Sequence, residues 1–212
     1  MRWTTCIFML CLAGQVTAQS TELPSRVNLV FGIGQLTQKG FNIEGNLFLK
    51  RFAFDFSHGI SLNLDNNQLE EGADKAQGLS IHLPWTTGFG LGYRFTDWLN
   101  LRVEPKWHKF ELFQQGTGQQ AQPFIGDYTT FTLGLGLYAN WLPFRQQDNF
   151  LKGLMIAPNV RWWPRLSSSL DKDRLYYFNV RTEQQEVHQA RQIGMVNTPF
   201  FLNVSVGYSF EF

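Results

Sequence analysis

The sequence predicts an all-β fold: an eight-stranded antiparallel up-and-down barrel of the transmembrane type, with short periplasmic turns and longer extracellular loops. Three observations carry this prediction. Apolar residues alternate with small or polar ones over long segments, the connections alternate between short and long, and large aromatic residues recur about ten positions apart. A soluble β-sandwich also alternates, so the connections and the aromatic residues decide between the two classes.

Alternation with a period of two is the pattern of a β-strand, whose successive side chains point to opposite faces. Phe131, Leu133 and Leu135, for example, alternate with Thr132 and Gly134. Eight segments share this pattern, and we expect strands near 25–35, 41–49, 52–64, 79–95, 99–113, 128–142, 150–165 and 199–212.

The alternation also assigns the two faces of each strand. If the alternation continues unbroken along each strand, it places the large apolar residues of 52–64 and 79–95 on the lipid-facing side. This outward set includes Leu62, Leu64, Leu79, Ile81 and Leu83. Their neighbours, Ser80 and His82 among them, are then expected on the inner face.

The connections support a barrel. Those at 50–51, 96–98 and 143–149 are short, whereas 65–78, 114–127 and 166–198 are long and polar. The connection 36–40 is an exception, because it is short where a long one is expected. An even number of strands with short turns at one end and long loops at the other is the plan of outer-membrane barrels, in which the short turns and both termini face the periplasm.

Aromatic residues on the outward face provide a further test. At about 3.3 Å per residue and a tilt near 40°, ten residues climb roughly 25 Å, the height of a lipid-facing apolar band. Aromatic pairs such as Phe200 and Phe210 have this separation, as expected for girdles at the two membrane interfaces. The predicted girdle residues are Trp85, Phe95, Phe131, Trp141, Phe150, Trp162 and Phe200.

Composition narrows the function. The 212 residues contain 18 Lys and Arg against 17 Asp and Glu, a balance that gives no sign of a nucleic-acid partner. The 20 Phe, 7 Trp and 19 Gly fit a lipid-facing sheet with a narrow interior better than a helical enzyme.

Residues 1–18 are predicted to form a cleaved signal peptide, which leaves 19–212 as the barrel domain. Arg2 supplies the positive start, a short apolar run follows, and Val16-Thr17-Ala18 offers small residues for cleavage. Both cysteines, Cys6 and Cys11, lie in this leader, so the mature barrel should have no disulfide and no thiolate chemistry, and we expect no cofactor.

The chain also resembles a known group of proteins. The ending Val204-Ser205-Val206-Gly207-Tyr208-Ser209-Phe210-Glu211-Phe212 and the run Gly88-Phe89-Gly90-Leu91-Gly92-Tyr93-Arg94-Phe95 are similar to those of the small barrels typified by the OmpA membrane domain, OmpX and OmpW. The resemblance implies outer-membrane residence among lipid and lipopolysaccharide. It also implies recognition by the barrel-assembly machinery through Tyr208, Phe210 and Phe212, but it specifies no activity.

Charged residues on the inner face are balanced. Four acidic and four basic positions leave an almost neutral lumen, whereas a selective pore shows one dominant sign. Eight strands leave room only for side chains, so these charges should pair with one another. The predicted lumen network comprises Glu44, Asp55, Arg94, Arg102, Glu104, Lys106, Arg161 and Glu211. Pairing across the 96–98 turn should set Arg102, Glu104 and Lys106 opposite Gly92, Gly90 and Gly88.

A lipid-modifying enzyme, similar to lipid A deacylases on such barrels, is the alternative function, and a narrow low-conductance channel is a third. Ser80, His82 and His108 are the candidates for a nucleophile and base, with Glu104 the nearest acid, and the two histidines are a weaker candidate metal pair. His58 falls on the lipid face, where it is either a tolerated defect, which we favour, or a contact with a partner protein.

The favoured function is non-enzymatic: a scaffold, surface-interaction protein or subunit of an envelope complex with a closed lumen. The loop 166–198 carries the partner hypothesis, because 175–181 and 186–191 indicate a hairpin that extends the seventh and eighth strands above the membrane. Exposed strand edges and aromatic residues are suitable docking surfaces.

Overall fold

The computed structural model describes residues 22–37, 39–64, 77–114 and 124–212. The predicted leader 1–18 and most of the two loops 65–78 and 114–127 lie outside these ranges. Within them, no helix is long and apolar enough to cross a membrane.

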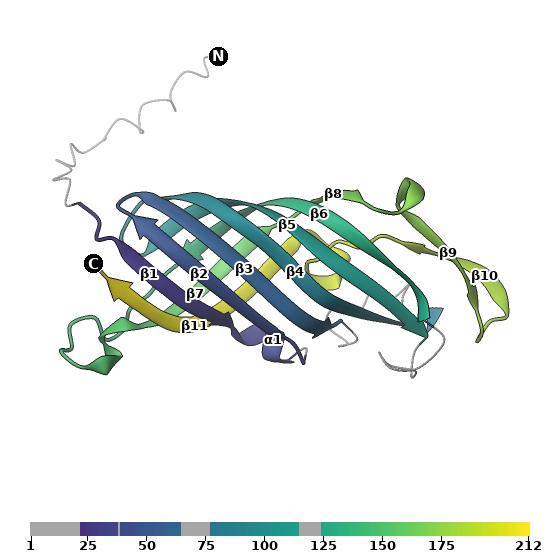
Figure 1. Cartoon of the computed structure of the whole chain (residues 1–212), viewed down its shortest axis with the longest axis horizontal. Coiled ribbons are helices and arrows are strands. Elements are labelled where there is room, and N and C mark those ends of the chain that lie inside the picture. The colour runs from purple at the N-terminus through teal and green to yellow at the C-terminus, as the bar shows by residue number, and fades with distance from the viewer. Residues whose placement is uncertain (1–21, 38, 65–76, 115–123) are drawn as a thin grey trace, which may run out of the picture.

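The fold is a closed antiparallel barrel of eight strands, as predicted (Figure 1). Each strand pairs with the next along the chain, and the first strand pairs with the last, so the sheet has no free edge. Around the ring the strands are β1 (Arg26–Gly32), β2 (Phe41–Leu49), β3 (Phe52–Asn63), β4 (Leu79–Arg94), β5 (Leu99–Gln114), β6 (Phe124–Ala139), β7 (Leu154–Trp162) and β11 (Phe200–Glu211).

Shorter elements fill the connections. The short helix α1 (Ile33–Thr37) follows β1, and the 3-10 helix η1 (Phe150–Gly153) precedes β7. Beyond β7, β8 (Arg165–Ser168) pairs with β6 and continues the wall of the barrel. The remaining elements are η2 (Asp171–Asp173), β9 (Arg174–Asn179), β10 (Gln184–Gln189) and η3 (Met195–Asn197).

Several predicted boundaries were wrong, among them the ends of the sixth and seventh strands, which lie at Ala139 and Trp162 and not at 142 and 165. The first strand ends at Gly32, where α1 begins, and the sixth begins at Phe124, ahead of the predicted 128. Residues 150–153 form η1, in which the Asn149 side chain accepts a hydrogen bond from the Leu151 N–H. That cap favours a helical turn over a strand at this point.

The face assignment of 62–64 and 79–83 was also wrong. Leu62, Leu64, Leu79, Ile81 and Leu83 are all buried in an apolar cluster, not turned toward lipid. The reason is local: Ser61 in β3 has a positive φ of 57°, and the pairing of β4 with β5 shifts register between His82 and Thr86. A shift of one residue turns every later side chain to the other face.

Consequently the barrel has a polar interior toward one end and an apolar interior toward the other. The cluster is completed by Phe110 and Leu112 from β5 and Tyr128 from β6, which lie where the alternation of these strands is unbroken, and by Tyr177 and Ala190 near β9 and β10. In Figure 1, β9 and β10 project from this end, opposite the start of β1 and the end of β11.

Candidate functional site

Three pairs of opposite charges meet in the middle of the lumen. Arg102 donates to Glu44 at 2.7 Å and to Asp55 at 3.2 Å, and Arg161 donates to the second oxygen of Glu44 at 3.1 Å. Asn46 and Asn100 add hydrogen bonds to Glu44 and Arg102. All of these side chains are buried, so the positive charges lie against carboxylates rather than water.

Aromatic rings separate the cations of this network. The Arg102 guanidinium lies 3.9 Å from the Tyr138 ring centre, and Arg161 lies 4.8 Å from the same ring and 4.7 Å from that of Trp163. The Tyr138 hydroxyl and the Trp163 indole N–H both donate to Glu104. The face of each ring therefore contacts cations, and its polar group donates to a carboxylate. These contacts stabilise the buried cations and the buried carboxylate in a narrow lumen.

Glycines make room for these long side chains, as the alternation predicted. Gly92 pairs with Arg102 and Gly88 with Lys106 across the β4–β5 ladder. A Cβ atom on Gly88 would meet the Lys106 side chain, and one on Gly134 would overlap the Trp163 ring. These positions cannot carry a larger residue without displacing the charged network.

Two of the eight predicted lumen charges belong to a different cluster at the end where the termini lie. Glu211 pairs with Arg26 and Arg145, both at 3.1 Å. Arg94 donates to Asp97 at 3.0 Å and to the carbonyl of Lys50 at 2.7 Å. This rim cluster joins β1, β4 and β11 to three of the short turns.

Sequence reasoning missed three members of the rim cluster. Asp97 is its centre, because it also pairs with Arg26 and Arg145. Arg26 could have been predicted as a lumen residue, since it lies an even number of positions from the buried residues Asn28 and Val30 and so on the same face of β1. Arg145 lies in a turn, where alternation assigns no face, so no signal in the sequence predicted its position.

The two candidate histidines do not share a face, so Ser80 and His82 are separated from His108. Because Leu79, Ile81 and Leu83 point inward, Ser80 and His82 lie on the opposite face of β4. The Nδ1 atom of His82 is hydrogen-bonded to Asn63 at 2.8 Å. The expectation of a shared inner face with His108 was therefore wrong.

His108 is held by two threonines within the lumen. Its Nδ1 atom lies 2.7 Å from the Thr86 hydroxyl and its Nε2 atom 3.0 Å from that of Thr132. Thr132 donates to the Lys106 carbonyl, so it accepts from an Nε2–H, and Thr86 donates to Nδ1. Both ring nitrogens are occupied in this neutral tautomer. Among the described residues, no group of three or more metal-ligating side chains is close enough to hold a metal ion.

His58 has a partner on the outer wall. It pairs across the β3–β4 ladder with Thr87, and its Nδ1 atom is hydrogen-bonded to the Thr87 hydroxyl. Both side chains are half-buried. A cross-strand hydrogen bond satisfies one nitrogen of an imidazole that faces an apolar environment.

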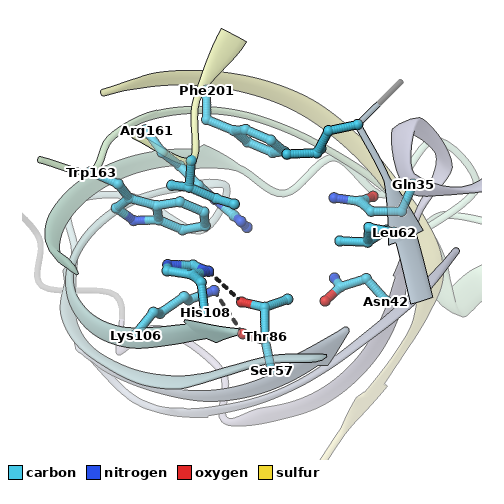
Figure 2. Close-up of a pocket in the computed structure, with 12 residues that line it drawn as sticks. Gln35, Asn42, Ser57, Leu62, Thr86, Lys106, His108, Arg161, Trp163 and Phe201 are labelled. Atoms are coloured by element: carbon cyan, nitrogen blue, oxygen red, sulfur yellow. Dashed lines mark hydrogen bonds between the residues drawn. The ribbon is translucent and has the colours of Figure 1, made fainter. Parts of the chain in front are cut away.

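A small cavity lies in the lumen, lined by residues of both its polar and its apolar parts (Figure 2). Its volume is about 40 Å³. Lys106, Ser57 and Arg161 line its polar part, and Leu62 and Phe201 contribute apolar surface. Figure 2 shows Lys106 hydrogen-bonded to Ser57 below the His108–Thr86 pair.

The outer wall carries exposed apolar side chains around the ring. Of the predicted girdle residues, all are exposed except Phe131, which is half-buried. Phe131 stacks near Trp107, with ring centres 5.0 Å apart, and Trp107 was not among the predicted girdle residues. Beyond Trp107 on β5, Lys109 forms an ion pair with Asp127 on the same wall. The apolar surface therefore gives way to charge before β5 ends.

Beyond the Lys109–Asp127 ion pair, β9 and β10 form a separate two-stranded sheet. The predicted hairpin is present, but it pairs with neither the seventh nor the eighth barrel strand. Its inner face docks on the barrel: Tyr177 joins the apolar cluster, and His188 is hydrogen-bonded to the Tyr128 hydroxyl at 3.0 Å. Hydrogen bonds from Asn179, Thr182 and Tyr177 hold the pKa of the Glu186 carboxyl below its usual value.

The outer face of this hairpin is apolar and open. Tyr176 is 66% exposed, Phe178 53% and Val180 54%, and Val187 lies directly opposite Tyr176. Exposed apolar side chains grouped in this way are characteristic of a contact surface, because a soluble surface has no reason to gather them.

No protein-family model matches the chain, and no curated protein matches it in sequence. Two crystal structures of Ail, the attachment invasion locus protein of Yersinia pestis, align over 88% of this chain and 99% of theirs, with 10% and 11% sequence identity. Their TM-scores are 0.42 and 0.41, and the second is a complex with the heparin analogue sucrose octasulfate.

At these values the alignments carry no argument about individual residues or ligands. The closed ring of eight strands, with charges inside and apolar residues outside, itself places the chain in the structural class of the small outer-membrane barrels. Its function is argued below from its own side chains.

Proposed function

We propose that this chain is an exported, integral outer-membrane barrel with a closed lumen, and that it acts without enzymatic activity as a surface-interaction protein. The observation that carries the proposal is the inverted distribution of side chains: arginines, lysine and carboxylates are buried inside, and rings and aliphatic chains cover the outer wall. Such a distribution is stable where lipid surrounds the barrel.

The hairpin β9–β10 supplies the interaction surface of this proposal. It is fixed to the barrel through Tyr177 and His188, and it presents Tyr176, Phe178 and Val187 away from it. Aromatic residues on a rigid support lose little conformational freedom on binding, which favours contact with a protein partner of the cell envelope or surface. The cleaved leader 1–18 and insertion by the barrel-assembly machinery remain part of the same proposal.

The orientation of the barrel can be tested by labelling. A cysteine at Gln184, in β10, should react with an impermeant maleimide on intact cells, because the long loops of such barrels face outward. A cysteine at Lys50, in the turn between β2 and β3, should react only after the outer membrane is opened. Both positions are exposed, so accessibility in the folded protein does not distinguish them. Labelling of the Lys50 variant on intact cells would reverse the orientation.

Conductance tests the closed lumen. The wild-type barrel in a planar bilayer should pass negligible current, since the paired charges and the apolar cluster fill the interior at successive levels. A steady, ion-selective current through the unmodified protein would support the channel hypothesis instead.

Photo-crosslinking tests the partner hypothesis directly. A photoreactive phenylalanine at Phe178, on the exposed face of β9, should yield a specific adduct in cells that express the protein. The matched control is the same group at Phe110, which is fully buried in the barrel. An adduct at neither position, or equal adducts at both, would count against the hairpin as the contact surface. Replacing Tyr176 and Phe178 by Ser should remove binding of the identified partner while leaving the barrel folded.

A further inference from the structure

The polar part of the lumen cavity has an uneven distribution of charge. Of the six charged residues in the central network, two line the cavity, and both are cations, Lys106 and Arg161. The three carboxylates of the network, Glu44, Asp55 and Glu104, do not line it. The cavity is therefore on the positive side of a network that is neutral as a whole.

Both cations have hydrogen-bonding capacity to spare. Arg161 is bonded to Glu44 through Nη2, but its buried Nε–H has no acceptor among the residues that the structure describes. Lys106 donates to the Ser57 hydroxyl at 2.7 Å, and its nearest carboxylate oxygen, on Glu104, is 3.8 Å away. An ammonium group has three N–H bonds, and the Ser57 hydroxyl that accepts one of them keeps its own hydrogen to donate.

We propose that this cavity binds one small monovalent anion of the halide class between Lys106, Arg161 and Ser57. The volume of about 40 Å³ exceeds what one water molecule needs and suits a single ion. The apolar side chains of Leu62 and Phe201 on the other side keep bulk water away, which strengthens the attraction between the ion and the two cations. Gln35 also lines the cavity: its buried Oε1 atom has no partner among the described residues, and a half-turn of the amide presents its NH₂ group to an anion instead.

The alternative occupant is water. An anion is favoured because the two charged residues that line the cavity are both cations, and the buried Arg161 Nε–H has no acceptor among the described residues. Water would leave part of this positive potential uncompensated, at a cost that rises as the surroundings become less polar. The site is independent of the hairpin and of the proposed surface function.

Bromide provides a direct test. Crystals of the folded barrel grown in sodium bromide should show an anomalous-scattering peak in the cavity, within hydrogen-bonding distance of Lys106 Nζ and Arg161 Nε. Bromide peaks confined to the surface, with none in the cavity, would overturn the proposal in favour of water.

Thermal unfolding in detergent gives a second measurement. At constant ionic strength, replacing gluconate, which is too large for the cavity, by chloride or bromide should raise the Tm of the wild type by a few degrees, because a ligand that binds only the folded state stabilises it. Lys106→Met should abolish this difference, and Lys109→Met, which removes an ion-paired lysine from the outer wall, should preserve it.

Because Lys106→Met leaves buried carboxylates with less compensation, that variant could fail to fold. Leu62→Phe, which fills the cavity from its apolar side and leaves every charge in place, should remove the same halide dependence. An equal rise in Tm for the wild type and the Leu62→Phe variant would show that the halide acts elsewhere and would overturn the proposal.

Discussion

Replacing Arg102 by Ala is expected to lower the free energy of unfolding of the barrel by about 3–5 kcal/mol, because it removes the cation that two buried carboxylates share. Arg102 is the only group in the described structure that bonds to both Glu44 and Asp55, and it is covered by the Tyr138 ring. Arg161 still compensates Glu44 in the variant, so the loss falls mainly on Asp55.

Urea titration of the barrel in lipid vesicles, followed by Trp fluorescence and by the shift between folded and heat-unfolded forms on a gel, measures this loss. Arg51→Ala is the matched control, since Arg51 is exposed at a turn and its guanidinium lies 6.0 Å from the Tyr93 ring. Adding Asp55→Asn to the Arg102→Ala variant should recover part of the stability, because the uncompensated charge is removed. A loss equal to that of the control would mean that the lumen charges are not a structural network.

Replacing Phe212 by Asp is expected to remove most of the inserted protein from cells without destabilising the folded barrel. Phe212 is 72% exposed, and its backbone N–H donates to the Ser25 carbonyl at 3.1 Å. Little folding free energy depends on its ring. The effect should therefore arise during assembly, if the terminal aromatic residue is the group that the insertion machinery recognises.

Two measurements separate assembly from stability. The amount of heat-modifiable protein in outer-membrane fractions should fall sharply for Phe212→Asp, while refolding of the purified chain into detergent should match the wild type. Phe212→Tyr, which keeps an aromatic ring at this position, should be inserted normally. If the Asp variant is inserted at wild-type levels, the terminal strand is not the recognition signal.

The sequence determined the class of fold because alternation, strand number and connection length are local properties. The alternation runs without interruption from Leu99 to Leu112 in β5 and from Tyr128 to Ala139 in β6, so the pattern alone places Arg102, Glu104 and Lys106 inside the barrel. The pairing of Arg102 and Lys106 with glycines of β4 followed from the length of one short turn. Both predictions depend only on geometry that neighbouring residues impose on one another.

Only the tertiary structure decided which face the outer parts of β3 and β4 present. A single left-handed residue, Ser61, and a register shift before Thr86 exchange the two faces. No glycine marks the break at Ser61, whereas the shift in β4 contains Pro84, a residue that within a strand indicates an edge or a bulge but does not fix which face follows. The exchange converts a predicted polar mouth with Ser80 and His82 inside into an apolar cluster, and it separates those residues from His108.

The partners of the charges were likewise decided by closure of the barrel. Alternation predicts that a side chain faces the lumen. It does not predict the depth of that side chain in the barrel or its partner on another strand. Arg161 on β7 reaches Glu44 on β2 across the interior, and Glu211 at the end of β11 reaches Arg145 in a turn. Such contacts join residues far apart in the chain, and their energies depend on burial and distance, which exist only once all eight strands are in register.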